Sequence, residues 1–217
     1  MIIYQRDKNM PWNLDRIRFL YPPDDFTGSF ANAKMQERHK ALQDQKIKVI
    51  LDHLEGHSKP LEAMQGLHPL DHLQFLHNNL EKFRQAGDLE KTVLLLYLKK
   101  NTPFAAVGDY AEWKSLLLQC DPARLYAEGK PFPFQSTTAY RGSMTGNPLG
   151  LSWSVSREDV DWFLERWQDK SLGGGTIFAM EITKEDILLY KEDEKRQEVL
   201  LRPDVAENRM ARVIDRL

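Results

Sequence analysis

Apolar residues in the first 130 positions recur at helical spacing. The clearest repeat lies in residues 69–87 and consists of Leu70, Leu73, Leu76, Leu80 and Phe83. Steps of three and four residues place these side chains on one face of a helix. Pro69 suits the first helical turn, and Gly87 suits the position after the last turn. Similar patterns predict further helices over residues 31–54, 88–100 and 109–119, with one more turn from Asp121-Pro122.

From residue 131 onward the pattern changes to short strands rich in β-branched and aromatic residues. We predict strands at Thr137–Tyr140, Leu151–Val155, Thr176–Ile182, Ile187–Tyr190 and Glu198–Leu201, and a final short strand or helix over 208–217. The one strong helical pattern among them is Arg157–Trp167, with Ser156 as its N-cap. Helices followed by strands predict an α+β fold. We expect a helical region over residues 1–130 and a β-rich core over 131–217, packed as one unit.

Composition and charge narrow the functional classes. The 217 residues include 30 basic and 32 acidic side chains, a net charge of −2. This charge excludes the strongly basic surface of a dedicated duplex-DNA binder, although a few local charges could still bind a nucleic acid. Cys120 is the only cysteine, so no disulfide framework and no cysteine-based zinc site is expected. The chain shows no signal peptide and no run of about 20 apolar residues, which predicts a soluble, cytoplasmic protein without a membrane partner.

The histidines do not form a metal-binding pattern. All six lie in residues 39–77. The segment His53-Leu54-Glu55-Gly56-His57 is similar to a zinc-binding helix, but its glutamate comes one position late for the H-E-x-x-H pattern and its glycine breaks the helix. His68 and His72 share helical spacing, but a proline between them begins a new helix. We therefore predict no metal site.

Two other enzyme signatures are missing. The sequence has no G-x-S-x-G motif, and no histidine lies near its serine-rich second half, so a serine hydrolase is not supported. The run Gly173-Gly174-Gly175 is not followed by Lys-Ser/Thr, as a phosphate-binding loop would require. We expect these glycines to form a flexible loop.

The remaining candidate chemistry lies in residues 139–156 and near residue 198. Arg141 is predicted on one strand, and Ser152 and Ser154 lie on a common face of the next strand because strand side chains alternate. Glu198 stands after a charged loop, at the start of an apolar strand. Each of these residues alone would be an ordinary surface position, and only their combination points to a site.

Together these segments resemble the arginine–serine–glutamate class of mono-ADP-ribosyltransferases, which includes many bacterial toxins and phage enzymes. The similarity lies in Tyr140-Arg141-Gly142, in Gly150-Leu151-Ser152-Trp153-Ser154 leading into a helix, and in Glu198 before a strand. It covers roughly residues 137–203 and implies a small mixed β-sandwich core that binds NAD. The rival class needs a histidine and a tyrosine, and the related RNA 2′-phosphotransferases also need a histidine. No histidine lies beyond residue 77, so neither fits.

The resemblance implies a role for each residue, with NAD as substrate and no metal. Glu198 would stabilise the positive charge that develops on the ribose as nicotinamide leaves. Arg141 would pair with the NAD phosphates, and Ser152 would orient Glu198. Tyr140, Gly142 and Ser154 would complete the NAD-binding set. For Trp153 and Trp162 we expect core packing. If a ring stacks on nicotinamide, Phe163 and an aromatic residue from another strand are equal candidates.

The sequence defines the acceptor of ADP-ribose less well than it defines the NAD-binding residues. Members of the class that modify arginine carry a glutamate two residues before the catalytic one, and others carry a glutamine. Arg196 occupies that position here, with Gln197 beside it. An arginine would repel a guanidinium group, so we expect a macromolecular acceptor other than protein arginine, either protein or nucleic acid. Arg196 and Gln197 are the candidates for acceptor recognition, and Glu194 is the alternative catalytic glutamate.

The sequence thus predicts an ADP-ribosyltransferase of a bacterial or phage toxin or effector, with the compact spacing from Arg141 to Ser152 favouring a small enzyme. Delivery of such a protein into another cell is compatible with this interpretation, and its helical region could bind the target or an immunity protein. Two alternatives stay open. The first is an NAD glycohydrolase, in which water is the acceptor. The second is a catalytically inactive interaction module of the same fold.

Overall fold

The computed structural model describes residues 11–17, 32–56, 59–98, 108–167, 175–193 and 196–216. The chain forms two compact units, Met1–Leu96 and Tyr97–Leu217. The sequence predicted a division at residue 130 and a single packed unit. The actual division comes earlier because helices of the predicted N-terminal region contact the strands; for example, Tyr97 is hydrogen-bonded to Ser152.

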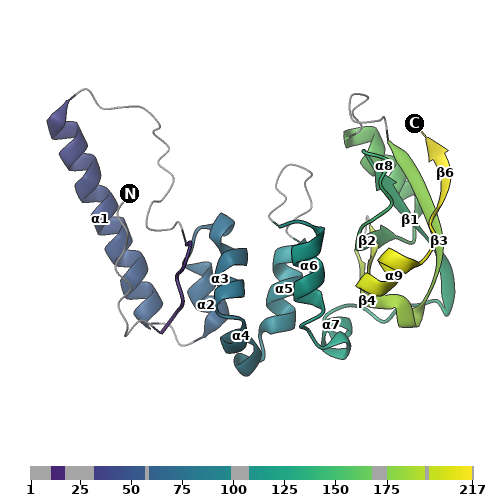
Figure 1. Ribbon diagram of the computed structural model, residues 1–217, viewed down its shortest axis with the longest axis horizontal. Helices are drawn as coiled ribbons and strands as arrows, with labels where there is room; N and C mark the ends of the chain where they lie inside the picture. Colours follow the sequence, from purple (N-terminus) through teal and green to yellow (C-terminus); the bar gives the residue numbers. More distant parts are fainter. Residues whose placement is uncertain are drawn as a thin grey trace. The chain divides into compact units, whose positions relative to one another are not determined.

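The first unit consists of helices, which lie in the purple and blue part of Figure 1. Its elements are α1 (Ala33–Gly56), α2 (Pro60–Gln65), the 3-10 helix η1 (Pro69–Asp71), α3 (His72–Asn78), α4 (Leu80–Ala86) and most of α5 (Leu89–Leu98). The predicted helices near 31–54 and 88–100 are therefore present, while α2 was not predicted. No helix in the described ranges is long and apolar enough to cross a membrane.

The helix predicted over residues 69–87 is interrupted at Asn79. The side-chain amide of Asn79 donates to the carbonyl oxygens of Phe75 and Asn13, at 2.9 and 3.0 Å. Its Oδ1 accepts from the backbone amide of Asn13 at 2.8 Å. These bonds attach an N-terminal segment to the helix pair and explain why the apolar repeat is divided between α3 and α4. Gly87 closes α4 in the left-handed conformation, with a φ of 77°, as predicted.

Within the described residues, the second unit contains four further α-helices and the 3-10 helix η3 (Lys184–Asp186). The α-helices are α6 (Tyr110–Leu117), α7 (Pro122–Ala127), α8 (Arg157–Trp167) and α9 (Pro203–Asn208). Asp109 and Asp121 accept backbone amides at the starts of α6 and α7, each at 2.8 Å. Ser156 Oγ accepts from the amide of Asp159 at 3.3 Å and caps α8. Side-chain oxygens at these positions satisfy amides that the helix leaves unpaired.

The strands of the second unit form one antiparallel sheet in the order β4-β5-β2-β1-β3-β6. They are β1 (Ser136–Ser143), β2 (Ser152–Ser154), β3 (Thr176–Thr183), β4 (Ile187–Glu192), β5 (Gln197–Leu201) and β6 (Arg212–Arg216). The α+β class is thus confirmed, but the described strands form a single sheet instead of the expected mixed sandwich. Because β2 has only three residues, it pairs with β1 at one position, Tyr140 with Ser154.

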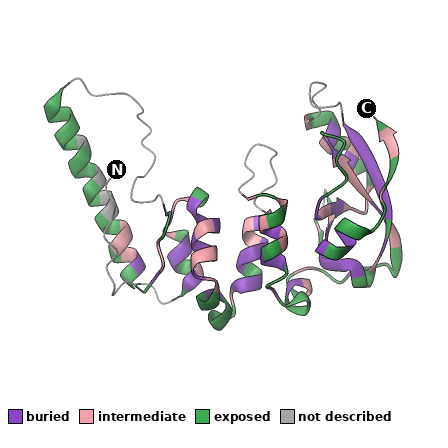
Figure 2. Cartoon of the chain, viewed as in Figure 1, coloured by how far each residue is buried: buried purple, intermediate pink, exposed green. Residues whose placement is uncertain are grey.

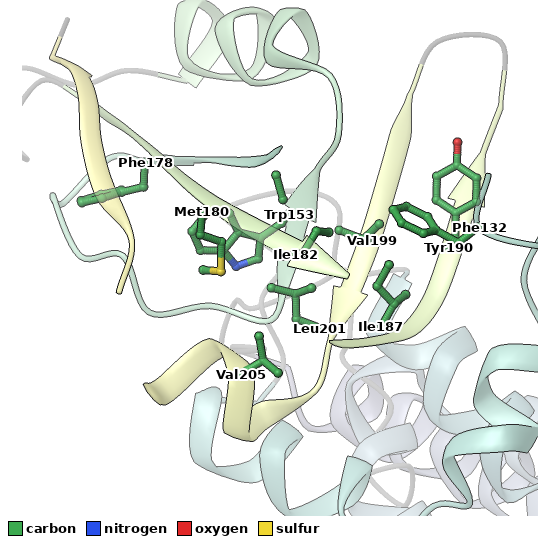
Figure 3. Packing of buried hydrophobic residues seen from close by; sticks show 11 residues of the cluster. Phe132, Trp153, Phe178, Met180, Ile182, Ile187, Tyr190, Val199, Leu201 and Val205 are labelled. Carbon is green, nitrogen blue, oxygen red and sulfur yellow. The ribbon is translucent and has the colours of Figure 1, made fainter. Parts of the chain in front are cut away.

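The main core of this unit draws side chains from both halves of the sheet, as Figure 3 shows. Trp153 of β2 and Met180 of β3 belong to this cluster, together with Val199 of β5. β3 is buried along most of its length, which appears as the purple strand in Figure 2. A smaller cluster is formed where α8 packs on β1. The shared core fixes β1, β2 and β5, the three strands that contain the candidate site residues.

Candidate active site

A cavity of about 420 Å³ lies within the second unit. Its walls come from the end of α5, α6, β1, the segment 149–151, β2, α8 and the start of β5. This volume falls in the range of pockets that accept a small organic ligand. Most of the predicted site residues line it: Tyr140, Arg141, Gly142, Ser152, Ser154, Arg196 and Glu198. Three strands that are distant in sequence therefore converge on one cavity.

The strand register brings the serines and the glutamate together. Ser154 of β2 pairs with Glu198 of β5, and Ser152 lies two residues away on the same face. Residues directly opposite each other on antiparallel strands have neighbouring side chains. On β1, Tyr140 is the residue that pairs with Ser154, so the neighbouring Arg141 leaves β1 on the opposite face.

The carboxyl group of Glu198 has a raised pKa. Burial raises its pKa above the usual glutamate range, and a hydrogen bond from the Ser152 hydroxyl offsets part of that effect. The nearby charges of Lys191 and Arg196 also lower the pKa, without reversing the net shift. A carboxylate with reduced solvation beside a cavity interacts strongly with a positive charge that forms there.

Tyr97, at the C-terminal end of α5, completes a hydrogen-bond chain to Glu198. Its hydroxyl lies 2.7 Å from Ser152 Oγ. An ionised carboxylate only accepts hydrogen bonds, so the single proton of Ser152 points to Glu198 and Tyr97 must donate to Ser152. Burial raises the pKa of Tyr97 to about 12, which keeps its hydroxyl protonated as that donor. The chain therefore runs from Tyr97 through Ser152 to Glu198.

Arg141 braces the segment that precedes β2. Its Nη1 donates to the carbonyl oxygen of Ser152 at 2.8 Å. The guanidinium lies so close to Gly150 that a Cβ at this glycine would stand 2.1 Å from Arg141 Cζ. Burial lowers the pKa of Arg141, although an arginine stays charged under all ordinary conditions. Its Nε is buried and has no hydrogen-bond partner among the described residues, so a ligand in the cavity could supply the missing acceptor.

The hydroxyl of Ser154 forms hydrogen bonds with three groups of the protein. Its Oγ lies 2.8 Å from both Asp159 Oδ2 and the carbonyl oxygen of Gln197, and it accepts from the amide of Ser156 at 3.1 Å. Asp159 Oδ2 also accepts from the amide of Gln197 at 2.9 Å. These bonds join β2, the start of α8 and β5. The hydroxyl of Ser154 is thus committed to the protein, which favours a bracing role over the predicted contact with NAD.

Three other predicted residues have local roles. Gly142 allows α8 to approach β1, because a Cβ there would lie 2.9 Å from Leu164 Cγ. Tyr140 packs against the α8 cluster at the cavity wall. Gln197 does not line the cavity, and its side-chain amide donates to Glu192 at 3.3 Å. This placement removes support for Gln197 in acceptor recognition. Glu194, the alternative catalytic glutamate, lies outside the described residues.

The aromatic residues of the site divide into core and rim. Trp153 is 3% exposed and belongs to the main core, as predicted, with its Nε1 donating to the Gly150 carbonyl at 2.8 Å. Trp162 does not pack in the core, contrary to expectation, because it is 44% exposed at the cavity. Its ring contacts the guanidinium of Arg196, whose Cζ lies 5.1 Å from the ring centroid. Phe163 also lines the cavity.

Two residues of the site were missed as site residues in the sequence. Tyr97 lies in a strongly apolar helix, and no local motif distinguishes it. Asp159 lies in the first turn of α8, where an acidic residue is favourable in any helix. Its three-residue spacing from the Ser156 cap was visible, but its bond to β5 depends on the sheet register.

The described ranges contain no group of three or more histidine, cysteine or acidic side chains that could bind a metal ion. Comparison of the chain with family models, with curated proteins and with solved structures finds no match. The case for a function therefore rests on the residues and geometry of the cavity.

Proposed function

We propose that this protein is an NAD-dependent mono-ADP-ribosyltransferase. The observation that carries the proposal is the chain from Tyr97 through Ser152 to the carboxylate of Glu198 at the wall of a cavity. It supports the roles inferred from the arginine–serine–glutamate resemblance, because the hydroxyl of Ser152 is hydrogen-bonded to the glutamate. Arg141 adds a buried positive charge at the same cavity, and its Nε has no hydrogen-bond partner in the described part of the chain, which fits a phosphate-bearing substrate.

In the proposed reaction the glycosidic bond between nicotinamide and ribose breaks, and neutral nicotinamide leaves with the bonding electron pair. Positive charge then develops on the ribose ring, and the carboxylate of Glu198 stabilises it. A nucleophile of the acceptor forms the new bond to C1′ of the ribose. The proton of the nucleophile passes to Glu198 or to water. No oxidant or metal is consumed, and the products are ADP-ribosylated acceptor, nicotinamide and one proton.

The proposal is tested by measuring nicotinamide release from NAD with the purified full chain. Glu198→Gln keeps the shape of the side chain and removes its charge, and we expect a loss of at least about 100-fold in rate, as for loss of one preorganised charge-stabilising group. Glu185→Gln is the matched control, because this exposed glutamate lies outside the cavity. We expect the control to retain full activity.

The outcomes separate the alternatives. Labelled ADP-ribose attached to a macromolecule supports the transferase. Free ADP-ribose as the sole product, with lysate acceptors present, would replace the transferase with an NAD glycohydrolase. A folded wild-type protein that releases no nicotinamide would overturn both enzymatic functions and leave the inactive interaction module.

A further inference from the structure

The cavity has a rim built from an exposed tryptophan and two arginines. The guanidinium of Arg196 lies 5.1 Å from the ring centroid of Trp162, and that of Arg166 lies 5.4 Å from the same ring. Arg166 also lies 5.2 Å from the ring of Trp167. Trp162, Trp167 and Arg196 all line the cavity. These contacts hold the guanidinium of Arg196 at the cavity and that of Arg166 beside two of the tryptophans that line it.

Arg166 and Arg196 have no carboxylate partner within the described residues, in contrast to Arg157 and Arg209 of the same unit. Arg157 is bonded to Asp215 at 2.7 Å, and Arg209 is bonded to Asp186. A guanidinium that stacks on a ring keeps its N–H groups at the edge available, since stacking uses its face. Arg166 and Arg196 can therefore donate to an anionic ligand while they stay in contact with Trp162.

The rim lies beside the proposed reaction centre. Arg196 precedes Glu198 by two residues, and both residues line the cavity. The charge of Arg196 is also close enough to lower the pKa of Glu198. An acceptor nucleophile must reach the ribose carbon next to Glu198. A group bound at Arg196 would therefore be delivered to that carbon.

We propose that the rim of Arg166, Trp162 and Arg196 binds a nucleotide of a single-stranded nucleic acid, which is the acceptor of ADP-ribose. This inference rests on the proposed function. Exposed bases stack on aromatic rings and on stacked guanidinium planes, and phosphates accept bidentate hydrogen bonds from arginine. A nucleophilic base or sugar atom bonds to C1′ of the ribose as nicotinamide leaves with its electron pair, and the displaced proton passes to Glu198 or water.

Two features favour this acceptor over others. The same positive charge at Arg196 repels a protein arginine. Arg141 lines the same cavity, and its buried Nε lacks a hydrogen-bond partner among the residues that the structure describes, so it is available for the phosphates of NAD itself. The net charge of −2 means that binding depends on these few local contacts and not on a basic surface.

Binding is tested without catalysis in the Glu198→Gln full chain. The probes are fluorescein-labelled single-stranded RNA and DNA oligonucleotides of 12 nucleotides, with the matching duplex for comparison, and fluorescence anisotropy is measured. We expect single strands to bind more tightly than the duplex. Adding Trp162→Ala or Arg196→Ala should weaken single-strand binding about tenfold, the usual effect of losing one stacking contact. Arg212→Ala, at an exposed arginine of β6, is the control and should bind like the parent.

Salt dependence adds an independent measurement. Each phosphate contact contributes about 0.7 to the slope of log Kd against log salt concentration for single strands. Removing both Arg166 and Arg196 should therefore flatten the slope by about 1.4. An unchanged slope and affinity in the double variant would overturn the inference.

The acceptor role is tested in proteins that retain Glu198, with labelled NAD, single-stranded oligonucleotide and lysate protein present together. We expect label on the oligonucleotide, and we expect Arg196→Ala to lower the ratio of transferred label to released nicotinamide about tenfold. Label on protein alone would overturn the inference. So would an unchanged ratio combined with a raised KM for NAD, because the rim would then bind NAD. If no nicotinamide is released but binding still depends on the rim, the proposed function fails and the rim remains a nucleic-acid-binding site.

Discussion

The hydroxyl of Tyr97 lies 2.7 Å from Oγ of Ser152, and this bond connects the end of α5 to the strand beside Glu198. Tyr97 is 9% exposed, and its ring packs edge-on against Trp113 of α6 at a centroid distance of 5.2 Å. Two helices thereby fix the position of a hydroxyl that in turn orients Ser152. The helices of this unit thus take part in the geometry of the site.

Tyr97→Phe tests this positioning role. The change removes the donor to Ser152 and keeps the ring that packs on Trp113. We expect kcat for nicotinamide release to fall about three- to tenfold, the worth of one neutral hydrogen bond. Tyr190→Phe is the control, because the Tyr190 hydroxyl is buried without a hydrogen-bond partner in the described part of the chain. Equal kcat values in the two variants would show that Tyr97 has no positioning role.

The pH dependence of the reaction should reflect Glu198. The reaction requires the ionised carboxylate, and burial raises the pKa of this group, so the rate should fall with decreasing pH at a pKa above the usual glutamate range. Ser152→Ala removes a hydrogen bond that favours the ionised form. We therefore expect the acidic limb of the profile of kcat/KM against pH to move to higher pH. A limb that stays in place or moves to lower pH would contradict the bond between Ser152 and Glu198.

The ionised carboxylate of Glu198 should also lower the free energy of unfolding of the protein. Its pKa is raised in the folded state, so folded protein binds the proton more tightly than unfolded protein. Stability then falls as pH rises from the ordinary glutamate pKa through the raised one, and the full penalty remains above that window. Glu198→Gln removes the penalty, and we expect Tm at pH 7 to rise by a few degrees, because about 2–4 °C corresponds to each kcal/mol in a chain of this size. The difference should vanish near pH 4, and a lower Tm at pH 7 would contradict the prediction.

Local patterns were sufficient to predict many elements of the fold. The caps Asp109, Asp121 and Ser156 each begin a helix where the sequence indicated, because capping depends on a side chain and the next few amides. The break at Asn79 could not be predicted, since it depends on a bond to Asn13, which is distant in sequence. The single sheet likewise depends on the pairing of Tyr140 with Ser154.

Part of the candidate site was predictable, because three of its residues occur along the chain in the order that the arginine–serine–glutamate class shows. Arg141, Ser152 and Glu198 were chosen from sequence, and the structure brings all three to one cavity. Tyr97 has no such context, because nothing in its helix indicates a partner 55 residues away. The exposure of Trp162 was also unpredictable, since a tryptophan on an amphipathic helix usually faces the core and only the packed structure shows otherwise.

Gly150 should be essential for the placement of Arg141. A Cβ at Gly150 would stand 2.1 Å from Arg141 Cζ and 2.3 Å from Nη2, closer than any real contact. Gly150→Ala must displace the guanidinium and with it the bond to the Ser152 carbonyl. We expect kcat/KM for NAD to fall at least about tenfold, the effect of losing a charged hydrogen bond.

Gly56→Ala is the matched control for this substitution. Nothing lies within 4 Å of a Cβ built at Gly56, which ends α1 in the other unit. We expect this variant to match the wild type in kcat/KM. If Gly150→Ala retained wild-type activity with Arg141 displaced, the assignment of Arg141 to the NAD cavity would be wrong.

Asp186 should account for part of the acid sensitivity of the second unit. Its carboxylate accepts from Nη2 of Arg209 at 2.9 Å, and from the amide and hydroxyl of Thr183 at 2.7 and 3.0 Å. Burial alone would raise the pKa of Asp186, but these bonds outweigh it and hold the pKa below the usual aspartate value. The resulting stability is present above the ordinary aspartate pKa and is lost as pH falls through the lowered one.

We therefore expect Asp186→Asn to lower the free energy of unfolding at pH 7 by about 1–3 kcal/mol, because it weakens a charged hydrogen-bond set in a largely buried position. The matched control is Asp204→Asn, which breaks the exposed pair with Arg202 and should cost no more than about 0–1 kcal/mol. Urea unfolding from pH 3 to pH 7 measures both variants. The difference between Asp186→Asn and wild type should shrink toward pH 3, because the stability from the ionised carboxylate is lost as pH falls below the ordinary aspartate pKa. A cost that is independent of pH would mean that the loss comes from packing and not from the charge of Asp186.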